Sequence, residues 1–304
     1  MANTISTLNM TKEEWLEKRH ESIGASDSAC ILGLNPWKSP VDLYLEKINP
    51  TINKDSNLAM KLGLKLEPII KDLLLEEHGM KVRNDNKIRV HPDEPWITAN
   101  LDGIVVGEKV PIEYKTTTTW DGEIPTHYFT QLQHQMFVTG ADYCYFAVLV
   151  LGYNKQFILE KYKRNDAFIG SLFFQMVGFW DRVEKKIPPE PWSTTDAQAL
   201  YNDAVCDKSI SADENVIKTL DELKLIQSEV KAHQFREREL KTELMKQMQD
   251  AEYILDDGGN KLISWKKSKP STTFDKSTFK EDQPEMYEKY LKETDGSRRF
   301  LVKR

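Results

Sequence analysis

Three charged residues in the segment ANLDGIVVGEKVPIEYKTT (99–117) have types and spacing that suit chemistry on a phosphate. Asp102 stands at a Gly turn, and ten residues separate it from Glu113, which Lys115 follows two positions later. Because alternate residues of a strand share a face, Glu113 and Lys115 are expected to point the same way. A hairpin across the intervening residues would bring Asp102 beside Glu113.

Two neighbouring carboxylates repel each other, and burying them is unfavourable without a compensating cation. A divalent metal ion is the natural compensator, since it prefers oxygen ligands. Lys115 could then position or deprotonate a water while the metal stabilises charge on a phosphate. The alternative is a turn residue, Asp102, and a surface pair, Glu113–Lys115, because short patterns of this kind often arise by chance. The apolar neighbours of both acids favour the metal site.

The elements that must position these residues follow from apolar spacing, capping residues and Gly or Pro stops. Helices are expected to begin near Thr11, Ser26 and Pro40 and to cover about 57–79, 128–140 and 166–186, with strands at 81–92, 96–106, 111–118, 143–152 and 156–164. This order predicts an α/β fold in which helices flank a central mixed sheet.

The character of the chain changes after IPPEPW (187–192), so we expect a core over residues 1–195 and an extension over 196–304. Residues 212–250 have helical spacing with a polar interruption, which fits two helices or one projecting helix. A turn at Asp257–Gly259 predicts a β-hairpin, followed by a short helix and a basic, strand-like end. The extension is a candidate for contacts to DNA, to other subunits or to a partner.

Composition limits the class of protein. The chain has 304 residues, 39% of them hydrophobic, and no apolar run of about 18 residues that would predict a membrane span. The N-terminal segment lacks the apolar stretch of a secretory signal, and three scattered cysteines favour a reducing cytoplasm over disulfides or a cysteine metal cluster. The net charge is −6, yet residues 261–304 carry +5, and DNA binding depends on such local fields.

Five segments follow one another in a characteristic order: EKRHESIGASDSACILGLNPW, LGLKLEPIIKDLL, ANLDGIV, IEYKTT and QLQHQMFVTG. In this order they resemble the YqaJ-type viral recombinases, relatives of phage lambda exonuclease in the PD-(D/E)xK nuclease superfamily, and the resemblance covers about residues 12–190. The tail FDKSTFKEDQPEMYEKYLKETDGSRRF is also similar to the C-terminal region of phage YqaJ proteins. The resemblance implies a restriction-endonuclease-like core.

The resemblance also implies roles for the central residues. Asp102 and Glu113 would bind Mg²⁺ or Mn²⁺ with help from the main-chain carbonyl of Tyr114. Lys115 would activate or position the water. Whether one or two metal ions act is left open.

Four further residues match positions of the family's site. Glu67 would support the metal and the nucleophile, and Gln133 would be the helix glutamine at the site, although Gln131 is an alternative because only one of the two needs to face it. Arg19 and Ser26 would hold the 5′-phosphate of the strand being degraded, for which a forked guanidinium and a hydroxyl near a helix start are suited. Without the resemblance, Arg19 reads as a surface charge and Ser26 as an N-cap.

The histidines and tryptophans give weaker signals. His91, His127 and His134 lack metal-ligand spacing and are expected to be structural. Trp37 and Trp120 could stack on a nucleobase, but packing is at least as good an interpretation.

The function that the resemblance implies is that of a phage-type alkaline exonuclease. It would hydrolyse the 5′-ended strand of double-stranded DNA from its ends and leave 3′ overhangs for a phage single-strand annealing protein. A homo-oligomer, a ring trimer as in the lambda member, and the cytoplasm of a bacterial host are also implied. The alternatives are an endonuclease of the same fold, since a fold does not dictate end preference, and a non-catalytic DNA-end-binding or partner module. The full set of site residues argues against the latter.

Overall fold

The computed structural model describes residues 3–49, 57–294 and 296–303, and the chain divides into two units, the first ending at Asn202 and the second beginning at Asp203. The first unit therefore extends beyond the predicted end of the core at residue 195. It includes α7 (Thr194–Leu200), which packs against α3 (Pro40–Ile48). The Ser39 hydroxyl donates to Asp196 Oδ1 at 2.6 Å, which ties the start of α3 to α7.

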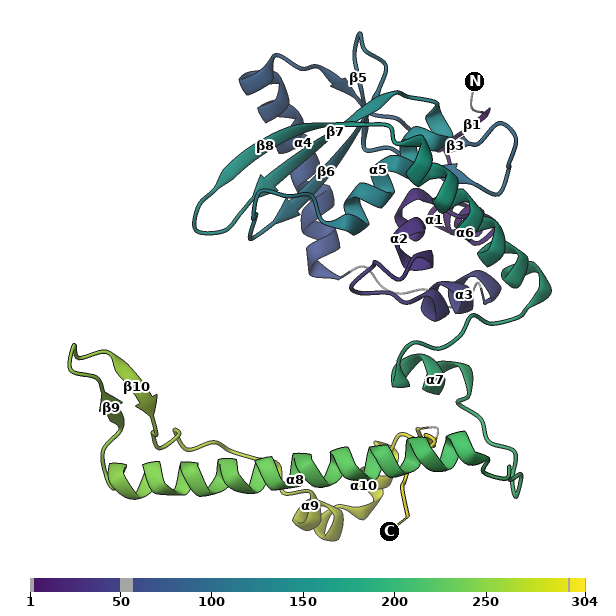
Figure 1. The fold of residues 1–304 in the computed structure, drawn as a ribbon. Helices are drawn as coiled ribbons and strands as arrows, with labels where there is room; N and C mark the ends of the chain where they lie inside the picture. Colours follow the sequence, from purple (N-terminus) through teal and green to yellow (C-terminus); the bar gives the residue numbers. More distant parts are fainter. Residues whose placement is uncertain (1–2, 50–56, 295, 304) are drawn as a thin grey trace. The chain divides into compact units, whose positions relative to one another are not determined.

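A five-stranded mixed sheet forms the centre of the first unit, as predicted (Figure 1). Its order is β2 (Val82–Arg83), β5 (Gly103–Val105), β6 (Pro111–Thr117), β7 (Tyr143–Val150) and β8 (Gln156–Lys163). Strands β6 and β7 are parallel, and the other neighbouring pairs are antiparallel. A parallel pair needs a crossover connection, which α5 (Thr126–Thr139) supplies.

A second sheet contains β1 (Asn3–Ser6), β3 (Lys87–Val90) and β4 (Thr98–Ala99). The predicted single strands over 81–92 and 96–106 are each divided between the two sheets, because the chain crosses from one sheet to the other within them. Buried Asp85 stabilises the first crossing by binding the Arg89 guanidinium at 2.6 and 2.8 Å. Asp102 lies in the second crossing, directly before β5.

Helices cover both faces of the central sheet. The long helix α4 (Leu58–His78) packs Ile70 and Leu74 on the face that contains Ile112 and Tyr114. On the opposite face, α5 packs against β7 through a cluster of Leu132, Met136, Phe146 and Val148. Strand alternation therefore turns Glu113 and Lys115 toward α5.

A helical layer packs beyond α5. It contains α1 (Lys12–His20), a 3₁₀ turn (Ala25–Asp27), α2 (Ser28–Ile31), α3 and α6 (Asp166–Lys185). Ile23, Leu43, Leu172 and Met176 form part of its core. The helix expected to begin near Thr11 is α1, where Thr11 is the N-cap and forms a capping box with Glu14.

The second unit begins with one continuous helix, α8 (Glu214–Met248), rather than two. A hairpin of β9 (Tyr253–Leu255) and β10 (Lys261–Ser264) follows, as predicted, and then α9 (Lys276–Asp282) and α10 (Pro284–Lys289). The expected strand-like end is wrong for residues 296–303, which are neither helix nor strand. Within the described ranges, no helix is both long and apolar enough to cross a bilayer.

Candidate active site

Glu113 is the centre of a polar cluster between β6 and α5. Its side chain is buried, and Lys115 forms an ion pair with its Oε1. Gln131 Nε2 donates to Oε1 at 2.5 Å, and Gln135 Nε2 donates to Oε2 at 2.6 Å. Residues four apart share a helix face, so α5 presents both amides to the same carboxylate.

Asp102 lies beside this cluster and is partly exposed. Its Oδ2 accepts a hydrogen bond from the main-chain nitrogen of Tyr114 at 2.8 Å, which fixes the acid next to β6. Loss of hydration and the negative charge of Glu113 raise the pKa of Asp102 to about 8, although Lys115 opposes the change. Burial is the larger cause, and repulsion between the two acids adds to it.

Lys115 and Glu67 complete the charge pattern. Burial acts to lower the pKa of Lys115, but the charges of Glu113 and Asp102 outweigh burial and raise it, so this side chain is a firm cation. Glu67 is half-buried on α4, and burial raises its pKa, with Lys71 opposing and Glu113 adding to the rise. A cationic Lys115 can orient a water but is poorly suited to deprotonate one.

The expectation that Gln133 faces this site is wrong. Its side chain is buried, with Nε2 donating to the Lys163 carbonyl at 3.0 Å and Oε1 accepting from the Asn165 nitrogen at 2.8 Å. Gln133 thus joins α5 to the turn between β8 and α6. Two positions along a helix rotate a side chain by about 200°, so Gln133 cannot share the face of Gln131 and Gln135. The four-residue spacing of the latter two was the signal in the sequence that could have found them.

The oxygen atoms at this site fit a hard divalent cation. The carboxylates of Asp102 and Glu113 and the main-chain carbonyl of Tyr114 are ligands of the type that Mg²⁺ and Mn²⁺ prefer. Burial and the charge of Glu113 raise the pKa of Asp102, and a bound cation would favour the ionised form of this acid. In the described parts of the chain, no three His, Cys, Asp or Glu side chains form a metal-binding group. The carbonyl and water would therefore fill the other positions around an ion.

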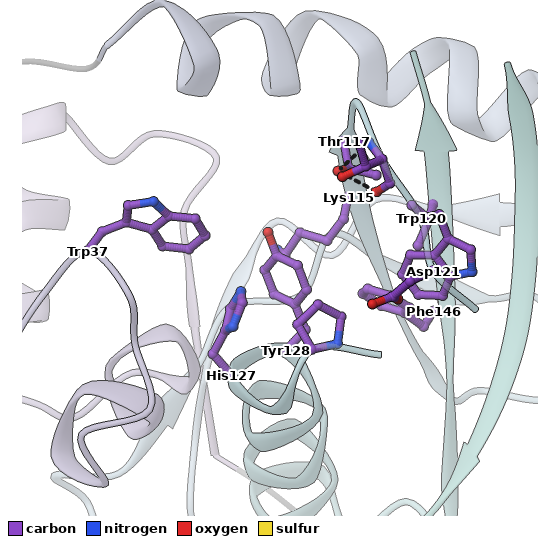
Figure 2. Close-up of a pocket in the computed structure, with 11 residues that line it drawn as sticks. Trp37, Lys115, Thr117, Trp120, Asp121, His127, Tyr128 and Phe146 are labelled. Carbon is purple, nitrogen blue, oxygen red and sulfur yellow. Dashed lines mark hydrogen bonds between the residues drawn. The ribbon is translucent and has the colours of Figure 1, made fainter. Parts of the chain in front are cut away.

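A cavity of about 350 Å³ lies on the Lys115 side of the cluster (Figure 2). Lys115 and Thr117 of β6, the loop after β6, the start of α5 and Trp37 line it. Aromatic side chains dominate its wall, and Lys115 Nζ lies 5.2 Å from the centre of the Tyr128 ring.

A second, smaller cavity of about 170 Å³ lies on the Asp102 side. Arg19 and Ser26, the two predicted phosphate ligands, line it together with Asp102 and Gln131. The structure thus brings both residues to the cavity that Asp102 borders. Ser26 lies within the 3₁₀ turn, whose N-cap is Gly24, so the N-cap interpretation of Ser26 does not hold.

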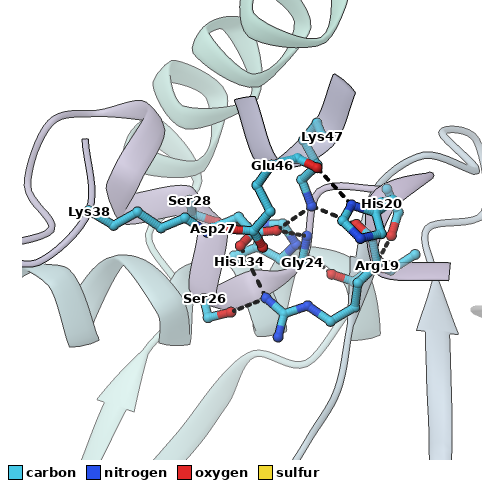
Figure 3. A network of polar contacts seen from close by, with 12 residues as sticks. Arg19, His20, Gly24, Ser26, Asp27, Ser28, Lys38, Glu46, Lys47 and His134 are labelled. Atoms are coloured by element: carbon cyan, nitrogen blue, oxygen red, sulfur yellow. Dashed lines mark hydrogen bonds and ion pairs between the residues drawn. The ribbon is translucent and has the colours of Figure 1, made fainter. Parts of the chain in front are cut away.

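Arg19 is held in place by a buried network (Figure 3). Its Nη2 lies 3.2 Å from Asp27 Oδ1 and 3.4 Å from Ser26 Oγ. Asp27 also accepts from Lys47 Nζ at 2.8 Å, and Lys47 and Arg19 together overcome burial to hold the pKa of this acid far below its usual range. About a third of the Arg19 side chain remains exposed, so the guanidinium is fixed yet accessible to an anion.

The buried histidine His134 is structural, as expected. Its Nε2 lies 2.9 Å from the Thr98 carbonyl and its Nδ1 lies 2.6 Å from Ser28 Oγ. Burial lowers the pKa of His134 to about 4, so the ring is neutral and joins α5 to both β4 and α2.

Comparisons with known proteins agree with this arrangement. The profile of the YqaJ-like viral recombinase domain matches residues 14–142, a range that includes the whole polar cluster and Arg19. The uncharacterized protein YqaJ of Bacillus subtilis (strain 168) is 34% identical over 308 residues, which cover 97% of this chain and 95% of that protein. The uncharacterized protein R354 of Acanthamoeba polyphaga mimivirus is 26% identical over 161 residues, which cover 47% of this chain and 29% of that protein.

Among solved structures, the alkaline exonuclease LHK-Exo of Laribacter hongkongensis superposes with a TM-score of 0.51 and 28% identity. The superposition covers 58% of this chain and 94% of that enzyme. The same enzyme in complex with dAMP gives equal values. The likeness thus covers a part of this chain that is close in size to its first unit.

Proposed function

The chain belongs to the YqaJ-like viral recombinase family, and from that premise we propose that it is a phage-type, metal-dependent exonuclease acting on double-stranded DNA. The observation that carries this proposal is the cavity that Arg19 and Ser26 share with Asp102. Arg19 and Ser26 offer an anion-binding site next to a pair of carboxylates of the kind that nucleases use. This arrangement suits an enzyme that starts from a phosphorylated DNA end. LHK-Exo, a related alkaline exonuclease, has been crystallised with dAMP, a mononucleotide of the kind that an exonuclease releases.

Each residue of the cluster has a proposed role. Asp102, Glu113 and the Tyr114 carbonyl would hold Mg²⁺ or Mn²⁺, which supplies charge stabilisation at the phosphate and acidifies a water. Lys115 Nζ donates a hydrogen bond that orients the attacking water. Glu67 of α4, whose pKa is influenced by the charges of Glu113 and Lys115, would support the metal and the nucleophile. Gln131 and Gln135 hold both oxygens of Glu113 in place.

The polarity of degradation follows from the position of the 5′-phosphate. If Arg19 and Ser26 hold that group, the bond placed over Asp102 and Lys115 lies on the 3′ side of the terminal nucleotide. Hydrolysis there releases a 5′-mononucleotide and exposes a new 5′-phosphate. Repetition would proceed 5′ to 3′ and leave a 3′-ended single strand.

The partners are proposed from the same premise. The 3′ overhang would be taken up by a phage single-strand annealing protein in the cytoplasm of a bacterial host. A closed homo-oligomer, such as a ring trimer, would keep the DNA enclosed. We place the subunit or partner contact on the second unit, because α8 exposes Val216, Ile217, Leu225 and Ile226.

The decisive experiment compares 5′-phosphorylated linear, 5′-hydroxyl linear and circular duplexes, each with Mg²⁺, Mn²⁺ or EDTA. We expect metal-dependent loss of the 5′-ended strand, fastest on the phosphorylated linear DNA. Equal cutting of the circle would instead support an endonuclease. Intact DNA in every lane, with tight binding to ends, would support a non-catalytic end-binding module.

A variant links the preference for 5′-phosphate to its proposed cause. Arg19→Ala should reduce the preference about 10- to 100-fold, because a charge-assisted hydrogen bond contributes roughly 1.5–3 kcal/mol. Lys12→Ala, at an exposed position of the same helix, is the matched control and should keep it. An unchanged preference in Arg19→Ala would rule out this phosphate site.

A further inference from the structure

The cavity on the Lys115 side has no role in the proposed chemistry, although it is the larger of the two cavities that border the cluster. Its wall is an aromatic pocket, defined here as Trp37, Trp120, His127, Tyr128 and Phe146 (Figure 2). Its volume of about 350 Å³ falls within the usual range for small-ligand sites.

The aromatic pocket has a rigid floor. Phe146 is fully buried, and its ring centre lies 5.8 Å from that of Tyr128 and 6.2 Å from that of Trp120. The three rings pack in the hydrophobic cluster between α5 and the central sheet. A flat ligand that enters the cavity therefore meets a preformed apolar surface.

The rim of the pocket is different, because it contains an exposed tryptophan. Trp37 is 72% exposed, and its ring meets His127 edge-on with 5.2 Å between ring centres. The loop that carries it is held by a hydrogen bond from the Trp37 nitrogen to Asn35 Oδ1 at 2.8 Å. A large indole held in solvent beside an open cavity leaves a ring free to stack on a ligand.

Polar groups in the pocket suit the edge of a nucleobase. His127 Nε2 is buried and finds no hydrogen-bond partner among the described residues. Burial lowers the pKa of His127, and the nearby Lys115 adds to this, so the ring is neutral and offers a hydrogen bond rather than a charge. Thr117, Thr119 and Asp121 add further polar groups.

We propose that the aromatic pocket binds one unpaired nucleobase of the cleaved strand, that of the second nucleotide from the 5′ end. This rests on the proposed exonuclease function. The two cavities have no lining residue in common, and one borders Asp102 while the other borders Lys115. If the 5′-phosphate binds Arg19 and the scissile bond lies over Asp102 and Lys115, the first nucleotide occupies the cavity on the Asp102 side. The second nucleotide then falls on the Lys115 side, where the aromatic pocket receives its base.

Stacking in this pocket would fix the scissile phosphate in place and tolerate any base sequence, because every base offers a π-face. It would also require the second base to be separated from its complement before cleavage. The expected contribution of one base–aromatic contact corresponds to a factor of about 5 to 100 in rate or affinity.

The test uses 5′-phosphorylated duplexes with one abasic residue at nucleotide 1, 2 or 3 of the cleaved strand, in single-turnover reactions. In the unmodified protein, the abasic residue at nucleotide 2 should slow the first cleavage about 5- to 100-fold relative to the intact strand. Trp37→Ala should cleave the intact strand more slowly than the unmodified protein does. In this variant, an abasic residue at nucleotide 2 should cause little further loss of cleavage rate. This double comparison cancels any effect of the abasic residue on duplex melting.

Phe174→Ala is the matched control, since Phe174 is 75% exposed on α6 and lies outside the pocket. It should keep the full penalty at nucleotide 2. A penalty at nucleotide 2 that Trp37→Ala leaves intact would overturn the proposal. The proposal is also overturned if Trp37→Ala removes a penalty at none of the three positions. It is overturned as well if the penalty that Trp37→Ala removes occurs only at nucleotide 1 or 3.

A second readout is independent of catalysis. With 2-aminopurine at nucleotide 2 and EDTA present, binding should quench the fluorescence by stacking, and Trp37→Ala should quench less than Phe174→Ala. Equal quenching by both variants would contradict the pocket. If no duplex is cleaved with any metal, the proposed function fails, whereas the quenching still decides whether the pocket holds a base.

Discussion

Replacing Asp102 by asparagine should stabilise the metal-free protein at alkaline pH. The asparagine can still accept the hydrogen bond from the Tyr114 nitrogen, so the change removes charge and little else. Because loss of hydration and, to a smaller extent, repulsion by Glu113 raise the pKa of Asp102, the ionised form of this acid opposes folding whenever no cation is bound.

The sign of the pH dependence follows from the two pKa values. Asp102 has an ordinary value of 3.8 when unfolded and about 8 when folded, so the folded state holds the proton more tightly. Stability of the metal-free protein therefore falls as the pH rises from about 4 to about 8 and changes no further through this group above that. Asp102→Asn should be free of this loss.

The magnitude can be bounded from the same values. A rise from 3.8 to about 8 corresponds to an upper limit of about 5–6 kcal/mol. Asp102 is partly exposed to its cavity, and water there screens the repulsion, so we expect about 1–3 kcal/mol. For a unit of this size that is roughly 3–10 °C in Tm.

Thermal unfolding in EDTA at about pH 5 and about pH 8.5 measures the difference. Asp102→Asn should unfold at a higher temperature than the unmodified protein at the upper pH, and the difference should be much smaller at the lower pH. Adding Mg²⁺ at the upper pH should stabilise the unmodified protein and leave the variant nearly unchanged. Asp72→Asn, at an exposed position of α4, should behave like the unmodified protein throughout. If the advantage of Asp102→Asn does not grow with pH, the pKa of Asp102 is not raised in the folded, metal-free protein.

Four other substitutions test the structure. Gln133→Ala should lower the free energy of unfolding, measured in urea, by about 1–3 kcal/mol and leave the cleavage rate per folded molecule unchanged. Gln131→Ala should reduce that rate with little loss of stability. If Gln133→Ala instead reduces the rate and Gln131→Ala does not, Gln133 belongs to the site. Lys47→Met removes a partner of buried Asp27 and should lose about 3–5 kcal/mol in the same assay, and a neutral result would mean that Arg19 alone compensates the acid. Gly33→Ala should lose about 2–3 kcal/mol, because Gly33 has φ +67° and a Cβ there would lie 1.7 Å from the Trp192 ring; an unchanged urea midpoint would show that this ring moves freely.

The sequence predicts those parts of the site that depend on strand alternation. The apolar run around Glu113 and the two-residue spacing to Lys115 place both side chains on one face of β6, whatever the rest of the chain does. The Gly turn after Asp102 likewise indicates a hairpin between this acid and Glu113, which brings Asp102 close to β6.

The rest depends on packing that a single sequence does not specify. The helix α5 is evident from its spacing, yet its rotation about its own axis decides whether Gln133 or the pair Gln131 and Gln135 meets Glu113. That rotation is set by Leu132 and Met136 against β7, a contact between segments far apart in the chain. The residue pattern also does not predict that residues 81–92 are divided between two sheets, because both halves have the pattern of a strand. The aromatic pocket brings a loop near residue 37 to the start of α5, which no local pattern predicts.

The choice of amides rather than further cations around Glu113 has a physical reason. Two glutamine side chains satisfy both oxygens of the carboxylate without neutralising it, and Lys115 is the one cation directly paired with it within the described residues. A second lysine or arginine in place of Gln131 or Gln135 would remove the negative charge that attracts a divalent ion. An apolar residue in place of Gln135 would remove the side-chain donor of buried Glu113 Oε2, at about 1–3 kcal/mol, whereas Oε1 keeps Lys115 if Gln131 is lost. Neutral donors are therefore the side chains that keep Glu113 both rigid and negatively charged, which a metal ligand at this position requires.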